Sequence, residues 1–142
     1  MKAEENLGGL LGKSSRLMSN ALDAHLKDLR LTSQQWSLMA ELAFAGGRNQ
    51  TELARALLKN KASVGSLIDY LETKNCIART ASPTDRRETI IELTPTGQAI
   101  FERSKPLAGD IITRATNGIN RDEQAIAQRV LKQIIQNLES SQ

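Results

Sequence analysis

The chain has 142 residues, with 19 basic and 16 acidic side chains, one cysteine and one histidine. Its length suits one compact domain, and no stretch approaches the roughly 20 apolar residues of a membrane span, so we expect a cytoplasmic protein without membrane attachment. Because Cys76 is the only cysteine, the chain cannot form an internal disulfide. With His25, Cys76 provides neither a metal-ligand cluster nor a nucleophile with its base, so we expect no metal, no cofactor and no enzyme activity.

The net charge of +3 is concentrated in the middle of the chain. Residues 48–88 contain eight basic and five acidic side chains, whereas the rest of the chain contains eleven of each. A polyanion is therefore expected to bind through this middle segment. Aromatic residues make up only 3% of the chain, which disfavours a stacking platform for single-stranded nucleic acid.

Capping signals divide the first third of the chain into helices. Residues 7–29 are predicted to form one long helix, which is weakened by its three glycines. Thr32 followed by Gln35 is a capping box, in which each residue's side chain bonds the other's backbone N–H. This signal predicts a second helix over residues 33–45, and the glycine pair that follows ends it.

A short helix and a helix with an apolar stripe follow. Asn49 with Glu52 forms a second capping box, which predicts a short helix to about residue 57. Asn60 can cap the next helix, over about residues 61–74, whose apolar residues recur on one face at Val64, Leu67, Ile68 and Leu71. Asn75 suits the left-handed conformation that ends such a helix.

Two β-rich segments, 76–80 and 88–93, flank the charged turn 82–87. This pattern predicts a two-stranded hairpin with a charged tip, over about residues 77–93. An isolated hairpin is marginally stable in water, so we expect it to pack on the helices.

The last third of the chain is predicted to be helical. Thr94 and Pro95 begin a helix that runs towards residue 117, with a kink at Pro106. Asn120 with Glu123 begins the last helix, whose apolar face is too broad for a lone surface helix. The first helix carries a similar seam at Leu11, Met18, Leu22 and Leu29. A symmetric interface between two copies would bury both faces, and packing within one subunit is the alternative.

The order of short helix, turn, striped helix and basic hairpin is typical of a winged helix-turn-helix domain. With its stripe turned inward, the striped helix presents a polar face that can approach bases in a major groove, formed by Lys61, Ser63, Ser66, Asp69, Tyr70 and Thr73. Taken singly, a capped helix cluster or a surface arginine pair also occurs in proteins that never bind DNA. Together these features predict a mainly α-helical protein with a small β-hairpin wing that binds double-stranded DNA.

Residues 31–97 resemble the MarR family of bacterial regulators. The similar stretches are residues 31–36, 50–54, 71–79, 82–87 and 93–97, of which the last two are the most specific. The resemblance implies a homodimer, with residues 1–30 and 98–142 as its helical dimerisation region and residues 31–97 as its DNA-binding lobe. It also implies a pseudo-palindromic operator, usually repression, and a small phenolic or lipophilic effector between the dimer helices and the lobe.

The predicted recognition helix departs from the family pattern. Where the family most often has serine or threonine followed by arginine, this chain has Gly65 and Ser66, and a glycine inside a helix costs about 1 kcal/mol relative to alanine. Base readout is therefore expected to be weaker, with more of the affinity from phosphate contacts. Lys61, Ser63 and Ser66 are the major-groove candidates, with capping and solvation as the alternative role. Gln50, at a helix N-terminus, can offer its backbone N–H to a phosphate.

The hairpin tip supplies the other candidate DNA-binding residues. Arg86 and Arg87 suit phosphates and the negative potential of a narrow minor groove. Asp85 is expected to orient a neighbouring side chain through a charge-assisted bond. The alternative is a solvated turn without a ligand.

Three further residues have two possible roles each. His25 and Trp36 can line an effector pocket, although a histidine near a helix end and a tryptophan beside a helix cap are also common packing residues. Cys76 can act as a redox sensor if it is exposed with a lowered pKa. Its apolar strand position favours a buried, inert thiol instead.

The competing function is a winged-helix adapter or antirepressor that binds protein and no operator. Gly65 and Ser66 leave this alternative open, because they remove the usual base-reading arginine. Salt dependence separates the two functions, since DNA binding through several lysines and arginines weakens steeply as salt rises.

Overall fold

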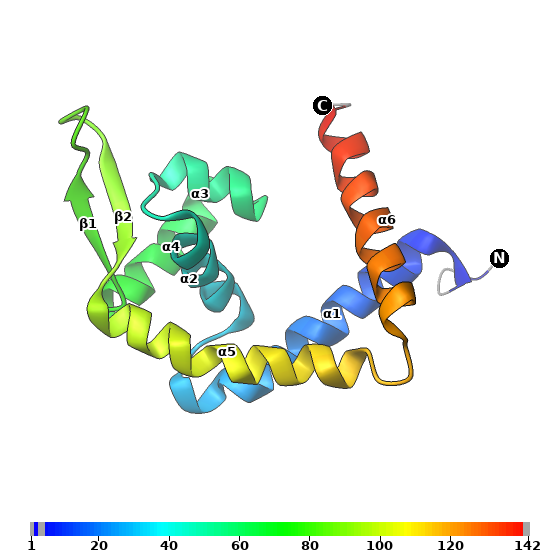
Figure 1. Ribbon diagram of the computed structural model, residues 1–142. Helices are drawn as coiled ribbons and strands as arrows, with labels where there is room; N and C mark the ends of the chain where they lie inside the picture. Colours follow the sequence, from blue (N-terminus) through cyan, green and yellow to red (C-terminus); the bar gives the residue numbers. More distant parts are fainter. Residues whose placement is uncertain (1, 3–4, 141–142) are drawn as a thin grey trace.

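The computed structural model describes residues 2 and 5–140. Its elements are α1 (Leu7–Leu26), the 3-10 turn η2 (Lys27–Leu29), α2 (Ser33–Ala45), α3 (Gln50–Leu57), α4 (Lys61–Thr73), β1 (Ile77–Ala81), β2 (Thr89–Leu93), α5 (Pro95–Ala115) and α6 (Arg121–Ser140). Figure 1 shows a lobe, formed by α2, α3, α4 and the hairpin, and a helical arm, formed by α1, the second half of α5, and α6. The predicted fold class, mainly α with a β-hairpin wing, is confirmed.

The predicted helix starts are confirmed because their caps are local hydrogen bonds. The Gln35 backbone N–H donates to Thr32 Oγ1 over 3.2 Å, and the Thr32 N–H donates to Gln35 Oε1 over 2.9 Å. Asn49 and Asn120 form the same reciprocal box with the glutamate three residues later. Asn60 accepts from the N–H of Ser63 and caps α4.

Several helix and strand ends differ by a few residues from the sequence prediction. The first helix leaves α geometry at Leu26, and its last residues form η2 before Arg30 adopts a left-handed conformation at φ 56°. Cys76 donates its N–H to Leu71 O and closes the end of α4, so β1 begins one residue later than expected. Asn75 has φ 60°, as predicted. α5 ends at Ala115 and is unbroken at Pro106.

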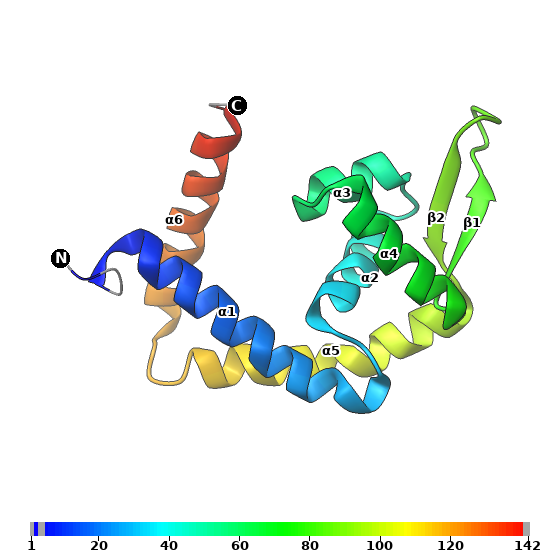
Figure 2. The same ribbon diagram turned by 180° about the vertical axis from the view of Figure 1, so that it is seen from behind.

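One apolar core joins the lobe to the arm. Its fully buried members come from seven elements and include Leu26, Leu38, Leu53, Ile68, Ile77, Ile91 and Phe101. The stripe of α4 faces inward as predicted, with Val64, Ile68 and Leu71 inaccessible to solvent and Leu67 partly buried. The opposite face of α4 therefore points outward, on the side seen in Figure 2.

The hairpin is held by Arg48, which lies two residues before α3. β1 and β2 pair antiparallel, from Ile77 opposite Leu93 to Ala81 opposite Thr89. Arg48 adds a bridge to Ile91 on the other edge of β2, through backbone hydrogen bonds of 3.0 and 2.7 Å. This bridge and the buried side chain of Ile91 supply the support that an isolated hairpin lacks.

The helical arm leaves much apolar surface exposed. α6 buries none of its residues, and in Figure 1 it stands away from the lobe. The seam predicted on α1 is wrong in part, because Leu22 and Leu29 pack against the core of their own chain. Met18 of the predicted seam is exposed, together with Leu7, Leu10 and Leu17, which the prediction did not include. No helix within residues 5–140 is long and apolar enough to cross a membrane.

Candidate nucleic-acid interface

α3 and α4 form a tight helix-turn-helix pair. Leu58 ends α3 in a left-handed conformation at φ 53°, and the N–H of Lys59 returns to Ala54 O over 2.9 Å. The turn is also bridged by a side chain, since Gln50 Nε2 donates to Lys61 O over 2.9 Å. The first residue of α3 is thereby tied to the first residue of α4.

The start of α4 carries the predicted major-groove residues. Lys61, Ser63 and Ser66 are all exposed. The Ser66 hydroxyl donates to Ala62 O one turn earlier over 3.3 Å, so its proton is used within the helix. Lys61 and Ser63 have side chains without such a bond in the described part of the chain.

The end of α4 is less available than the sequence analysis expected. Tyr70 donates its hydroxyl to Arg30 O over 2.6 Å, and Thr73 Oγ1 donates to Asp69 O over 2.8 Å. Asp69 is itself paired with Arg79 of the hairpin. With Ser66, four of the six polar residues predicted on the outer face of α4 are thus engaged with the protein.

Arg79 connects the hairpin to α4, and the sequence analysis missed it. Its Nη2 lies 2.8 Å from Asp69 Oδ1, and its Nε lies 3.3 Å from the carboxylate of Glu72. One guanidinium thus spans two acidic residues on successive turns of α4, which orients β1 against that helix. The pairing also offsets one of the two negative charges beside a surface proposed to face phosphates.

The hairpin tip is ordered by side-chain hydrogen bonds to its backbone. Ser82 Oγ accepts from the N–H groups of Thr84 and Asp85, both over 3.3 Å. Asp85 Oδ1 accepts from the backbone N–H of Arg87 over 3.0 Å and lies 3.8 Å from Arg87 Nε. Arg86 and Arg87 are both exposed, and the Arg87 side chain is 95% accessible to solvent. The tip therefore presents two arginines on a turn whose backbone is held by Ser82 and Asp85.

The strand β2 and the residue before it, Glu88, are joined to the start of α3. Asn49 caps α3 with its Oδ1, and its Nδ2 donates to Glu88 Oε1 beside β2. Arg48, the preceding residue, bridges to β2 and lies 3.6 Å from Glu41 of α2. The helix-turn-helix and the hairpin are therefore held together at α3 by Arg48 and Asn49, and at α4 by Arg79.

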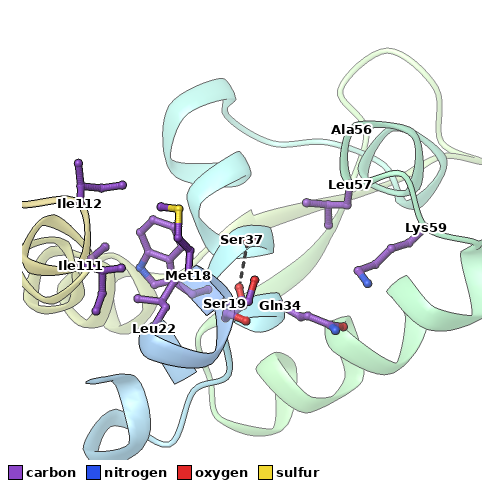
Figure 3. Close-up of a pocket in the computed structure, with 13 residues that line it drawn as sticks. Met18, Ser19, Leu22, Gln34, Ser37, Ala56, Leu57, Lys59, Ile111 and Ile112 are labelled. Carbon is purple, nitrogen blue, oxygen red and sulfur yellow. Dashed lines mark hydrogen bonds between the residues drawn. The ribbon is translucent and has the colours of Figure 1, made fainter. Parts of the chain in front are cut away.

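A largely apolar cavity of about 470 Å³ lies between the lobe and the helical arm, beside the core that joins them. Figure 3 shows its lining, which comes from α1, α2, the end of α3 and α5. Lys59 is the single charged residue of that lining, whose apolar members include Met18, Leu22, Leu57, Ile111 and Ile112. Trp36 lines the cavity as expected, whereas His25, the other predicted pocket residue, does not.

Trp36 has a packing role as well. Its ring stacks on Phe101 with centroids 5.7 Å apart, and its Nε1 donates to Ser104 Oγ over 2.7 Å. Ser104 is fully buried, and its hydroxyl donates a hydrogen bond to Phe101 O over 2.6 Å. The sequence analysis did not identify this link between α2 and α5.

Cys76 does not have the surroundings of a reactive thiol. Its side chain is buried, with 0% of its surface exposed, and its Sγ lies 3.9 Å from Lys74 O. Burial raises the pKa of the Cys76 thiol, and the nearby charge of Lys74 offsets only part of this effect. The geometry matches the buried, inert alternative. Within residues 5–140, no group of three histidine, cysteine or acidic residues could hold a metal ion.

Comparisons with known proteins agree with this architecture. The MarR family model matches residues 31–88. The HTH-type transcriptional repressor NicR of Pseudomonas putida is 26% identical over 96% of this chain and 87% of its own length. The transcriptional repressor CouR, solved bound to a 23-mer DNA duplex, is 31% identical with a TM-score of 0.84, over 93% of this chain and 94% of that one.

A third relative concerns regulation. A structure of Bordetella bronchiseptica BpsR, described as explaining how 6-hydroxynicotinic acid regulates its DNA binding, is 25% identical with a TM-score of 0.84. It covers 94% of this chain and 96% of that one. The matched family model, the relatives spanning nearly the whole chain and the shared winged helix-turn-helix agree. The chain belongs to the MarR family.

Proposed function

We propose that the protein is a homodimeric, sequence-specific repressor of transcription that binds double-stranded DNA. The observation that carries this proposal is that one lobe presents both an exposed, uncommitted helix start and an exposed arginine tip. Lys61 and Ser63 lie on that helix, and Arg86 and Arg87 lie on that tip. Both belong to one lobe held together through Arg79, and the relatives NicR and CouR carry the name of repressor.

In this proposal residues 61–74 enter the major groove and residues 77–93 reach the adjacent minor groove. Lys61, Ser63 and Ser66 approach base edges or phosphates, and the arginine tip approaches the narrow groove, where guanidinium groups are favoured. Residues 31–97 would then be the DNA-binding lobe. Residues 1–30 and 98–142 would be the dimerisation region.

The exposed apolar surface of the helical arm is the reason for proposing a dimer. Its exposed apolar side chains include Leu7, Leu10, Leu17, Ile112, Ile119, Ile126, Leu131, Ile135 and Leu138. A monomer would leave this surface in water, whereas a symmetric second copy would cover both arms at once. Two lobes related by a two-fold axis match a pseudo-palindromic operator.

The cavity between lobe and arm supports control by a small molecule. Its apolar walls and its single cation, Lys59, suit an aromatic or lipophilic compound with one anionic group, such as a carboxylate or phenolate. Because α1 and α5 line one side and α2 and α3 the other, an occupant would shift the lobe relative to the dimer. BpsR, regulated by an aromatic acid according to its description, is a precedent among the relatives.

The test is selection of genomic fragments by the purified full chain, followed by footprinting and a salt titration. We expect a protected palindrome and a steep loss of affinity as salt rises. A chain that retards no duplex at any salt concentration would overturn the proposal and favour the protein-binding adapter.

The effector is tested on the same operator complex. Benzoate and its neutral amide are compared as releasing agents, with the fluorescence of Trp36, the only tryptophan, as the reporter of cavity occupancy. We expect release by the acid and loss of the preference for the acid in Lys59→Ala. An equal response to acid and amide in the unmodified protein would remove the role of Lys59.

A further inference from the structure

We propose that the side chain of Gln50 reads an adenine in the major groove. Gly65 leaves room for this side chain, and the backbone carbonyl of Lys61 accepts a hydrogen bond from its amide. This inference rests on the proposed function and assigns one of its base contacts. It also changes the expected role of Gln50, from a backbone donor for phosphate to a side chain that sets sequence specificity.

The first step is the position of the amide. Gln50 is the first residue of α3 and is partly exposed, and its Nε2 donates to Lys61 O over 2.9 Å. That carbonyl lies in the first turn of α4, where the helix N–H of Gly65 also points to it. The amide of Gln50 therefore lies across the first turn of the recognition helix.

The second step is the reason for a glycine at position 65. A Cβ built there would lie 3.1 Å from Gln50 Nε2, closer than almost all Cβ contacts. Glycine inside a helix lowers helix stability relative to alanine, so its presence calls for a compensating reason. Here the missing side chain leaves room for the Gln50 amide over α4.

The third step is elimination among the neighbouring polar groups. The hydroxyls of Ser66, Tyr70 and Thr73 all donate to backbone carbonyls, and Asp69 is paired with Arg79. Gln50 and its neighbours Lys61 and Ser63 are left as side-chain donors to a base on this side of the lobe, because the committed hydroxyls, that of Ser66 included, can only accept. Gln50 alone among these three carries both a donor and an acceptor on a planar group.

The fourth step is the count of hydrogen-bonding positions on the amide. One N–H of Nε2 is used by Lys61 O, and Oε1 accepts no hydrogen bond from any group within residues 5–140. One N–H donor and one carbonyl acceptor remain, side by side. Adenine offers the complementary pair in the major groove, N7 as acceptor and the N6 amino group as donor, whereas guanine offers two acceptors.

The test uses selection from randomised operators by three full-length proteins, the unmodified chain, Gln50→Ala and Gly65→Ala. We expect Gln50→Ala to lose preference for A·T at one position in each half-site, by about 5- to 150-fold, with the other positions unchanged. Gly65→Ala should lose preference at the same position while its melting temperature stays the same or rises, because alanine favours the helix. Gln98→Ala, an exposed glutamine at the start of α5, is the matched control and should change neither.

Two results would overturn the inference. A uniform loss of affinity across all sequences in Gln50→Ala would mean that the side chain contacts only phosphate. Unchanged selection by Gln50→Ala would mean that the amide reads no base, and unchanged selection by Gly65→Ala would mean that Gly65 does not make room for a base-reading amide. If the unmodified chain selects no duplex, the proposed function itself fails and this inference fails with it, so the two failures are distinguishable.

Discussion

The arginine tip allows a quantitative prediction about salt. Replacing Arg86 and Arg87 by alanine in both protomers removes four positive charges from the proposed interface. Each phosphate contact contributes about 0.9 to the slope of log K against log salt concentration, so the slope should become shallower by about 3.6 if every arginine neutralises one phosphate. Between 50 and 200 mM salt, the unmodified protein should then lose about 150-fold more affinity than the variant.

The fold should tolerate this double substitution. Arg87 is 95% exposed and its one ion pair within residues 5–140, with Asp85, spans 3.8 Å, so the melting temperature and the dimer should be unchanged. Fluorescence anisotropy with a labelled operator, measured across the salt range, gives the slope. Lys27→Ala with Arg103→Ala is the matched control, because both residues are exposed cations outside α3, α4 and the hairpin.

The reasoning would be refuted by a slope equal to that of the unmodified protein. That result would mean that the tip remains in solvent when the operator is bound. A slope that falls equally in the control pair would show instead a general charge effect, without a specific role for the wing.

Four other predictions concern packed or apolar residues. Ser104→Ala should lower the free energy of unfolding in urea by about 1–3 kcal/mol, because it leaves the Trp36 Nε1–H without its acceptor, and an unchanged value would assign that bond no role. The raised pKa of Cys76 means that the unfolded thiol ionises first, so stability should fall above its ordinary pKa of 9.0 in the unmodified chain but not in Cys76→Ala, as followed by melting at increasing pH. The same Cys76→Ala change should leave the peroxide response of operator binding unaltered, and a lost response would revive the sensor. Replacing Ile126 and Ile135 by lysine should give monomers in sedimentation and abolish operator retardation with helical content retained; a stable dimer would place the interface elsewhere.

Most helix starts could be predicted because the interactions that define them are local. The boxes at Thr32 and Asn49 and the cap at Asn60 each involve residues three positions apart, so the spacing in sequence is the spacing in space. The inward face of α4 was also predictable, because a helix buries residues that recur with its own period. The turn at residues 82–87, exposed from residue 83 onward, followed from turn residues and charge for the same reason.

The links between elements were not predictable in this way. Arg79 pairs with acids seven and ten residues away, and Trp36 bonds Ser104, which is 68 residues away. No periodicity relates these positions, since the contacts depend on how the hairpin and α5 cross the helices. Gln50 and Gly65 are another such pair, so the sequence analysis treated the glycine only as a loss of base readout.

By itself the sequence determined the order of the elements, their caps and the segment that holds the excess positive charge. Only the tertiary structure decided which polar groups of α4 remain uncommitted, and which apolar seams are covered by the chain itself. Leu22 and Leu29 pack against the core, whereas α6 has no buried residue. The physical reason is that an apolar helix face has the same pattern whether its own subunit or another molecule covers it, and only the three-dimensional arrangement distinguishes the two.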